Sequence, residues 1–155
     1  MSKPYRPQNY FLRRLTSRRD WYTPFELNRL LQLMTDANAK NRDWATFYVA
    51  LSVHNSTEIT RKLFKNSFDA DRETSAEATL GLARRHHPCA CNLVKSRLSA
   101  KRIGILDVKA AGYVANRTLV KPLRRIEKWW DVDRDYLTAA IRACKNGGID
   151  DYNFD

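Results

Sequence analysis

The fold is decided by two stretches, Thr35-Asp36-Ala37-Asn38-Ala39-Lys40-Asn41-Arg42-Asp43-Trp44-Ala45-Thr46-Phe47 and Glu77-Ala78-Thr79-Leu80-Gly81-Leu82-Ala83-Arg84-Arg85. Both carry apolar residues at the spacing of an amphipathic helix. Each is followed by a break, at Asn55-Ser56-Thr57-Glu58 or at His86-His87-Pro88, and then by a second helical pattern. The sequence therefore predicts helical hairpins that recur along the chain.

A third copy of this pattern spans Ile105 to Ala115, breaks at Asn116-Arg117-Thr118 and resumes at Leu119. Overlaying the three copies gives an internal period of roughly 31 to 33 residues, in the range of stacked helical-hairpin repeats. A helix start is predicted at Thr23-Pro24-Phe25-Glu26, and a last helix from about Asp133 to Cys144. Small residues are expected where helices approach closely, at Ala45, Ala78, Gly81, Ala110, Ala111 and Gly112. No alternating run predicts a strand.

The two opening stretches resemble successive repeats of bacterial HEAT-repeat proteins. The resemblance covers about Glu26 to Leu98 and, more loosely, Ile105 to Trp130, where the acidic loop and the alanine-rich start are lacking. It implies an all-α fold, an α-solenoid or right-handed superhelix of HEAT-like helical hairpins with about eight or nine helices. In that family these motifs are scaffold, so they imply a fold and no reaction.

The length of 155 residues fits one domain. We expect residues 1–22 to form an N-terminal cap or arm, residues 23–145 the stacked hairpins, and residues 146–155 an acidic C-terminal tail. No apolar run approaches the roughly 20 residues that cross a bilayer. Three cysteines are an odd count that argues against a disulfide framework. We therefore expect a cytoplasmic protein, monomeric when free, with no membrane partner.

The net charge of +11 and the pI near 9.9 predict an acidic partner, because excess charge of one sign destabilises a chain unless a partner offsets it. Most basic residues of the middle and late groups lie on or beside second helices, which in such solenoids resemble a ladder on the concave face. The predicted partner-binding residues are Arg84, Arg85, Lys95, Arg97, Lys121, Arg124, Arg125, Lys128, Trp129 and Trp130.

Two clusters have to be weighed as chemical sites. His86, His87, Cys89 and Cys91 are potential zinc ligands, but no second ligand pair follows at zinc-finger spacing, so a turn with packed cysteines is the favoured interpretation. Trp129-Trp130 with Asp131, Asp133 and Asp135 resembles the Trp and Asp of HEAT-like DNA glycosylases. A core tryptophan beside a helix-capping aspartate explains the same residues. We expect no catalytic residue, metal or cofactor.

The leading hypothesis is a non-catalytic protein-binding module whose basic concave surface docks an acidic partner protein. A specific case is an immunity protein that neutralises a bacterial toxin by covering its active site. The alternative is nucleic-acid binding through the same groove, including a HEAT-like DNA glycosylase. The sequence leaves these classes open.

Overall fold

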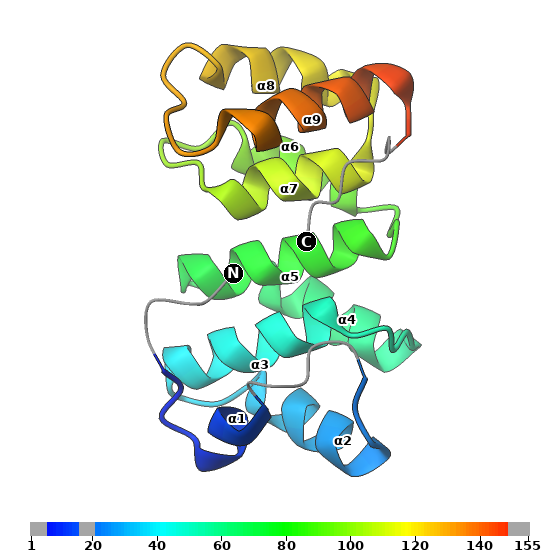
Figure 1. Cartoon of the computed structure of the whole chain (residues 1–155). Coiled ribbons are helices and arrows are strands. Elements are labelled where there is room, and N and C mark those ends of the chain that lie inside the picture. Colours follow the sequence, from blue (N-terminus) through cyan, green and yellow to red (C-terminus); the bar gives the residue numbers. More distant parts are fainter. Residues whose placement is uncertain (1–5, 16–20, 149–155) are drawn as a thin grey trace. The chain divides into compact units, whose positions relative to one another are not determined.

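The computed structural model describes residues 6–15 and 21–148, and every regular element within these ranges is a helix (Figure 1). The first half contains α1 (Tyr10–Arg14), α2 (Pro24–Leu33), α3 (Ala39–Leu51), α4 (Thr57–Asn66) and α5 (Arg72–Arg84). The second half contains α6 (Ala90–Arg97), α7 (Ile105–Val114), the 3-10 helix η2 (Arg117–Leu119), α8 (Val120–Ile126) and α9 (Arg134–Asn146). The all-α prediction is confirmed. None of these helices is both long and apolar enough to cross a bilayer.

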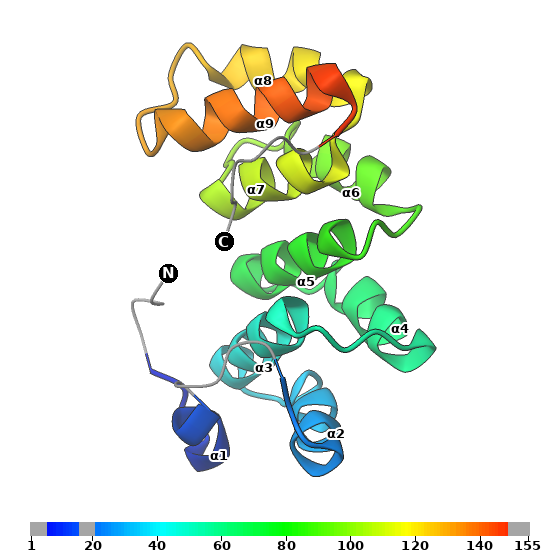
Figure 2. The ribbon, with the colours of Figure 1, turned by 45° about the vertical axis from the view of Figure 1, so that its right-hand side comes forward.

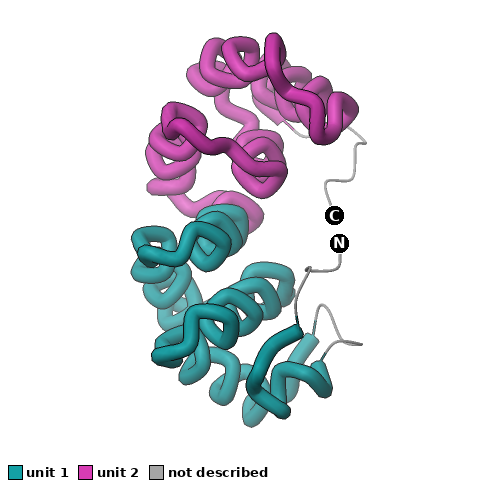
Figure 3. The backbone as a smooth tube through the Cα atoms, turned by 90° about the vertical axis from the view of Figure 1, so that its left-hand side faces the viewer, with its two compact units in different colours: residues 1–81 teal, residues 82–155 magenta. Residues whose placement is uncertain are grey.

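The chain divides into two compact units, residues 1–81 and residues 82–155 (Figure 3). In the first unit α3 contacts α1, α2 and α4. In the second, α7 contacts α6 and α9, and α9 also contacts α8 and η2. Neighbouring helices therefore pack against one another within each unit, and the contact of α3 with α4 matches the first of the predicted hairpins.

Side-chain caps begin the helices where the sequence predicts a break. Thr23 and Glu26 form the predicted capping box at the start of α2, with the Thr23 N–H donating to Glu26 Oε2 at 2.9 Å. Ser56 caps α4, Asn116 caps η2 and Asp133 caps α9. Each cap satisfies backbone N–H groups that have no partner inside the helix. The local polar residues thus fix the helix boundaries.

Helix α5 begins ahead of the predicted position. The apolar pattern starts at Ala76, whereas α5 begins at Arg72. Asp71 Oδ2 accepts hydrogen bonds from the Thr74 N–H at 2.8 Å and from Thr74 Oγ1 at 2.7 Å. This capping interaction adds a polar first turn that apolar periodicity cannot detect.

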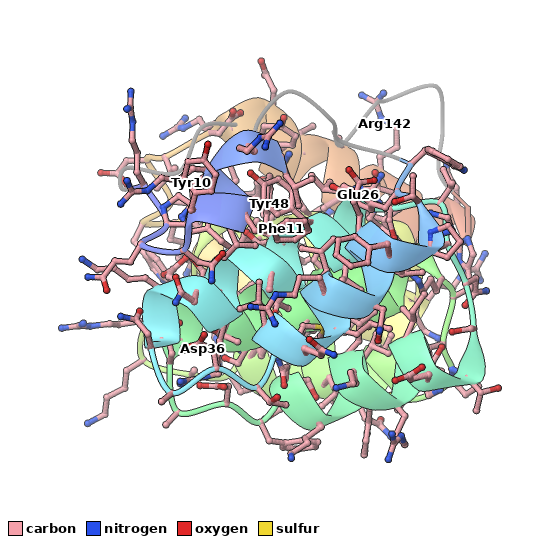
Figure 4. The ribbon with its side chains drawn as sticks, turned by 90° about the horizontal axis from the view of Figure 1, so that it is seen from below. Tyr10, Phe11, Glu26, Asp36, Tyr48 and Arg142 are labelled. Carbon is pink, nitrogen blue, oxygen red and sulfur yellow. The ribbon has the colours of Figure 1, made fainter. Side chains whose placement is uncertain are left out.

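The core of the first unit includes a polar contact at the end of α2. Asn66 Nδ2 donates to the Met34 carbonyl at 3.0 Å and to Thr46 Oγ1 at 2.9 Å, and Asn66 is buried. Tyr48 lies on the side of α3 near α1, where its hydroxyl donates to the Leu12 carbonyl at 3.4 Å (Figure 4). Buried polar groups are paired in both places, so the core tolerates them.

Gly81, one of the predicted small residues, lies at a close contact between two helices. A Cβ at Gly81 would lie 2.8 Å from the Cβ of Ala50 and 3.0 Å from its Cα. Backbone atoms cannot be displaced cheaply, so this position of α5 requires glycine against α3. Ala45, Ala78, Ala110 and Ala111 are completely buried. The prediction that small residues permit close approach is confirmed at Gly81.

Three tertiary hydrogen bonds that run from a side chain to a backbone carbonyl in the described residues join positions about one predicted repeat apart. Lys62 Nζ donates to the Leu31 carbonyl over 31 positions, and Asn66 to Met34 over 32. In the second unit Cys144 Sγ donates to the Ala111 carbonyl over 33 positions. The same contact, from a side chain to a carbonyl near the C-terminal end of a helix, therefore recurs at the spacing read from the sequence.

An ion pair closes the loop between α4 and α5 onto α3. Arg42 Nε and Nη2 donate to the two carboxylate oxygens of Asp69 at 2.8 and 2.9 Å, and Arg42 Nη1 donates to the Asp36 carbonyl at 2.9 Å. The hydrogen bond from Arg42 holds the pKa of Asp69 below its ordinary value, against the opposing effect of burial. Two loops are thereby tied to one guanidinium.

We expect Ala115→Gly to stabilise the second unit. Ala115 ends α7 with φ 49°, ψ 40°, a left-handed conformation that disfavours a Cβ by about 1–2 kcal/mol. Glycine removes that strain but gains entropy in the unfolded chain, so a net increase of roughly 0.5–1 kcal/mol in unfolding free energy is expected. Urea unfolding measures it, with the mid-helix variant Ala111→Gly as the control that must destabilise. A loss of stability in Ala115→Gly would contradict the assignment.

Asp69→Asn is expected to lower the unfolding free energy by about 1.5–3 kcal/mol at pH 7, because a charged bidentate hydrogen bond is lost. Since the folded pKa of Asp69 is depressed, its contribution is complete above the unfolded value near 3.9 and disappears as pH falls through the folded value. The difference between wild type and Asp69→Asn should therefore shrink below about pH 4. Unfolding curves between neutral and acidic pH test this, with the exposed Asp131→Asn as control. A difference independent of pH would refute it.

Candidate basic surface

Three basic residues lie on the exposed side of α8 (Val120–Ile126), and a fourth, Lys128, follows in the turn directly after it. Lys121, Arg124, Arg125 and Lys128 follow one another at helical i, i+3, i+4 and i+7 spacing, and all four are exposed. The opposite side of the helix is anchored by Leu119, Leu123 and Ile126, which are completely buried. The apolar side therefore determines which way the basic side points. We call these four cations the α8 stripe.

Helix α9 lies beside α8 and continues this basic character (Figures 1 and 2). Its inward residues include Leu137, Ala140 and Cys144, all buried, whereas Arg142 and Lys145 are exposed. The Arg142 side chain projects away from the helices (Figure 4). Between the two helices is a surface depression of about 260 Å³, which we call the basic depression, lined by Arg124, Glu127, Thr138, Ile141, Arg142 and Lys145.

Most cations of this surface have no ion-pair partner within residues 6–15 and 21–148. In those ranges the side chains of Lys121, Arg124, Lys128, Arg142 and Lys145 form no ion pair or hydrogen bond, and neither does that of Lys95 on α6. Glu127 is the one carboxylate among the residues that line the depression. A cluster of like charges without partners raises the local positive potential and attracts anionic groups.

Other predicted partner-binding cations have internal roles. Arg97 pairs with Asp107, whose side chain is 1% exposed and whose Oδ2 also accepts from the Gly104 N–H at 2.8 Å. Arg125 Nη2 donates to the Leu98 carbonyl at 2.8 Å and so joins α8 to the end of α6. Arg97 is therefore a structural residue. Arg125 is exposed, but one of its guanidinium nitrogens is hydrogen-bonded to the end of α6.

Arg84, which ends α5, and Arg85, which follows it, belong to the second unit. The Arg84 guanidinium lies over the Tyr113 ring, 5.5 Å from its centroid, which is within cation–π range. Burial, together with a smaller effect of repulsion from Arg84, lowers the pKa of Arg85 to about 10. Both side chains are only half-exposed. They are less accessible to a partner than the α8 stripe.

The two predicted tryptophans have different environments. Trp129 is 55% exposed, whereas Trp130 is 2% exposed and its indole N–H donates to the Asp133 carbonyl at 2.8 Å. Asp133 Oδ1 in turn accepts from the N–H groups of Asp135 and Tyr136, as the N-cap of α9. Trp130 thus belongs to the core instead of the binding surface, and Asp133 is a helix cap.

The His-Cys segment forms the turn between α5 and α6. His86 takes the left-handed conformation that ends α5, with φ 50°. The N–H groups of His86 and His87 donate to the carbonyls of Ala83 and Leu82 at 2.9 and 3.0 Å. His87 Nδ1 lies 2.8 Å from Cys89 Sγ, and burial raises the pKa of Cys89. No group of three or more His, Cys, Asp or Glu side chains in the described parts of the chain is placed to hold a metal ion.

Arg142 and Lys145 were not among the predicted partner-binding residues. The signal for them is the polar side of the last helix, where Arg134, Thr138, Arg142 and Lys145 recur at i+4, i+4 and i+3 spacing. That pattern predicts an exposed face. It does not predict that this face adjoins α8, because the pairing of α8 with α9 is a tertiary contact.

The second unit therefore presents a surface of packed helical hairpins with unpaired cations. No protein-family model matches the sequence. Protein YibA of Escherichia coli strain K12 and its counterpart in strain O157:H7 are each 25% identical over 116 residues, which cover 75% of this chain and 41% of theirs. The crystal structure of E. coli YibA matches with a TM-score of 0.67 and 24% identity, over 77% of this chain and 43% of that one. The chain thus spans about two fifths of the length of these relatives, and the structural likeness shows the fold alone.

Removing the three cations of the α8 stripe other than Arg125 should leave stability nearly unchanged, whereas removing Arg97 should not. Exposed cations without partners contribute within about 0.5 kcal/mol each, so Lys121→Ala/Arg124→Ala/Lys128→Ala should unfold close to wild type. Arg97→Ala removes the guanidinium that pairs with the buried Asp107 carboxylate and should cost about 3 kcal/mol or more. Urea midpoints of the two variants provide the comparison. A triple variant as unstable as Arg97→Ala would show that the stripe is structural.

Proposed function

We propose that this chain is a non-catalytic protein-binding module that docks an acidic partner protein through the α8 stripe and the basic depression. The observation that carries the proposal is the set of exposed cations that form no ion pair in the described parts of the chain. We also propose that the hairpins belong to a HEAT-like solenoid, the arrangement that the sequence resemblance implies.

The surface combines features that speed and anchor association. Like charges on α8 and α9 steer an acidic partner toward this face and raise the association rate. Trp129, which is 55% exposed, follows the stripe directly and supplies a large apolar contact of the kind that dominates interface energies. Steering cations beside an aromatic anchor are what a tight, specific protein contact requires.

A specific form of this proposal is an immunity protein that covers the active site of a bacterial toxin. Such a role needs tight binding and no catalysis, so it suits a surface of cations and aromatic residues. It also requires the toxin to present carboxylates to the α8 stripe, which gives the proposal a defined chemical partner. Co-expression tests this form directly, because full toxicity in the presence of excess protein would end it.

Nucleic-acid binding is the second candidate, favoured by the linear arrangement of the α8 stripe. From Lys121 to Arg125 its cations lie along about 6 Å of helix, which is close to two steps of about 3.4 Å between phosphates on one strand of a duplex. Backbone binding of this kind weakens steeply with salt because it releases counterions. A protein complex anchored by a desolvated tryptophan is less sensitive to salt.

We expect the tagged protein to capture one stoichiometric partner protein from lysate of its source cells, and this partner to survive nuclease and a wash at about 0.5 M salt. Arg124→Glu/Lys128→Glu should abolish the capture, because the stripe then repels an acidic surface. The matched control is Arg61→Glu/Lys65→Glu, which reverses two exposed charges at the same spacing on α4. Mass spectrometry and the ratio of absorbances at two wavelengths identify the captured material. Bulk nucleic acid that disappears on either treatment would replace the first candidate with the second.

A further inference from the structure

Cys89 and His87 form a close thiol–imidazole pair in the turn between α5 and α6. His87 Nδ1 lies 2.8 Å from Cys89 Sγ, which is within hydrogen-bond reach of the thiol. Both side chains are partly exposed, so a small molecule can reach the sulfur. A nucleophile and a base at this separation are the two groups that a reactive thiol requires.

The hydrogen bonds of this turn determine which nitrogen of His87 can take up a proton. The backbone N–H of Cys89 donates to His87 Nδ1 at 3.3 Å. A ring nitrogen that accepts a hydrogen bond carries no hydrogen, so the neutral imidazole has its hydrogen on Nε2. Nδ1 is therefore the basic nitrogen, and it is the one that faces the Cys89 sulfur.

The place of Cys89 in the helix favours the negative charge that its sulfur develops on reaction. Cys89 is the N-cap of α6 (Ala90–Arg97), and its side chain makes no capping hydrogen bond. The N-terminus of a helix carries a partial positive charge that stabilises a thiolate. Burial acts in the opposite direction and raises the pKa of Cys89, so the resting group is the protonated thiol. Reaction of this thiol therefore requires a base.

The other two cysteines lack such a base. Cys91 is also partly exposed, but its sulfur lies 3.8 Å from Thr118 Oγ1, a hydroxyl that does not take up a proton at neutral pH. Cys144 is completely buried, its Sγ donates to the Ala111 carbonyl, and burial raises its pKa to about 11. The chain thus contains two internal references for the reactivity of Cys89.

We propose that Cys89 is a modification site that forms a mixed disulfide with low-molecular-weight disulfides, and that His87 is the base of this step. Cys89 Sγ attacks one sulfur of the small disulfide while the thiol proton passes to His87 Nδ1. The new S–S bond forms as that of the small disulfide breaks, and the departing thiolate takes the proton from Nδ1. Cys89 is oxidised to the mixed disulfide, the departing half is reduced to a free thiol, and neutral His87 is restored.

This site is independent of the proposed function, because neither Cys89 nor His87 belongs to the α8 stripe or lines the basic depression. It lies within the described residues, unlike the predicted acidic tail, whose residues 149–155 lie outside them. Excess small thiol reverses the exchange, so the modification responds to the ratio of small thiol to small disulfide.

The test measures the rate at which the folded full-length protein forms a mixed disulfide with glutathione disulfide at neutral pH, followed by intact mass. It compares Cys91→Ser, which retains Cys89, with Cys89→Ser, which retains Cys91. The variant that retains Cys89 should react at least about tenfold faster. Both variants keep Cys144, which should stay unmodified because it is completely buried.

His87→Asn in the Cys91→Ser background tests the base. Asparagine Oδ1 can still accept the hydrogen bond from the Cys89 N–H but cannot take up a proton, so the rate should fall at least about tenfold. The matched control is His86→Asn, which removes the neighbouring imidazole and tolerates the left-handed φ of 50° at that position. It should change the rate less than about twofold, because His86 is not the base. Unchanged circular dichroism and unfolding midpoints show that each variant is folded.

Equal rates for the variants that retain Cys89 and Cys91 would overturn the site, and this comparison leaves His87 in place. A rate that is unchanged or raised by His87→Asn would overturn the base. A purely structural role for His87 predicts a raised rate, since a loosened turn exposes the sulfur. Failure of either test leaves the capture of an acidic partner unaffected, because that capture depends on the α8 stripe.

Discussion

The structure depends on how the carbonyl groups at the C-terminal ends of its helices are satisfied. The last turn of a helix leaves carbonyls without an intrahelical partner, and burying them unpaired is costly. Lys62 and Asn66 donate to the carbonyls of Leu31 and Met34 at the end of α2. Arg125 donates to the Leu98 carbonyl, which ends α6. In each case a polar side chain of a later helix donates a hydrogen bond to a carbonyl at the end of an earlier helix. The contact helps to fix how the two helices are positioned against each other.

The need to satisfy buried carbonyls and carboxylates also distinguishes cations with a structural role from cations that are free to contact a partner. Arg125 contributes to register through the Leu98 carbonyl, and Arg97 neutralises the buried Asp107. Lys121, Arg124 and Lys128, on the same side of α8 as Arg125, make no such contact in the described parts of the chain. The burial of Leu119, Leu123 and Ile126 fixes the orientation of α8 and so determines which way the stripe faces. Packing does not explain why the residues on that side are basic. Four cations on one exposed side exceed what packing needs.

Local signals made much of the fold predictable. The capping box at Thr23 and Glu26, the turn at Asn116 and the glycine after α9 are each encoded within a few residues, and the helices begin or end there. The site was less predictable because exposure depends on tertiary contacts. Sequence spacing could not show that Trp130 turns inward to the Asp133 carbonyl or that Arg97 meets Asp107. Nor could it show that Arg142 and Lys145 face α8 across a depression.

The composition of the basic surface bears on which partner it favours. A uniform row of cations serves phosphates along a backbone, which are equally charged and evenly spaced. Here the row is interrupted by features that a polyanion does not use: Glu127 repels phosphate, Ile141 offers apolar contact, and Trp129 is exposed next to the stripe. Protein surfaces combine carboxylates with apolar side chains at irregular spacing, which complements a mixture of cations and apolar groups. The mixture of one carboxylate and apolar side chains among unpaired cations therefore supports an acidic protein over nucleic acid.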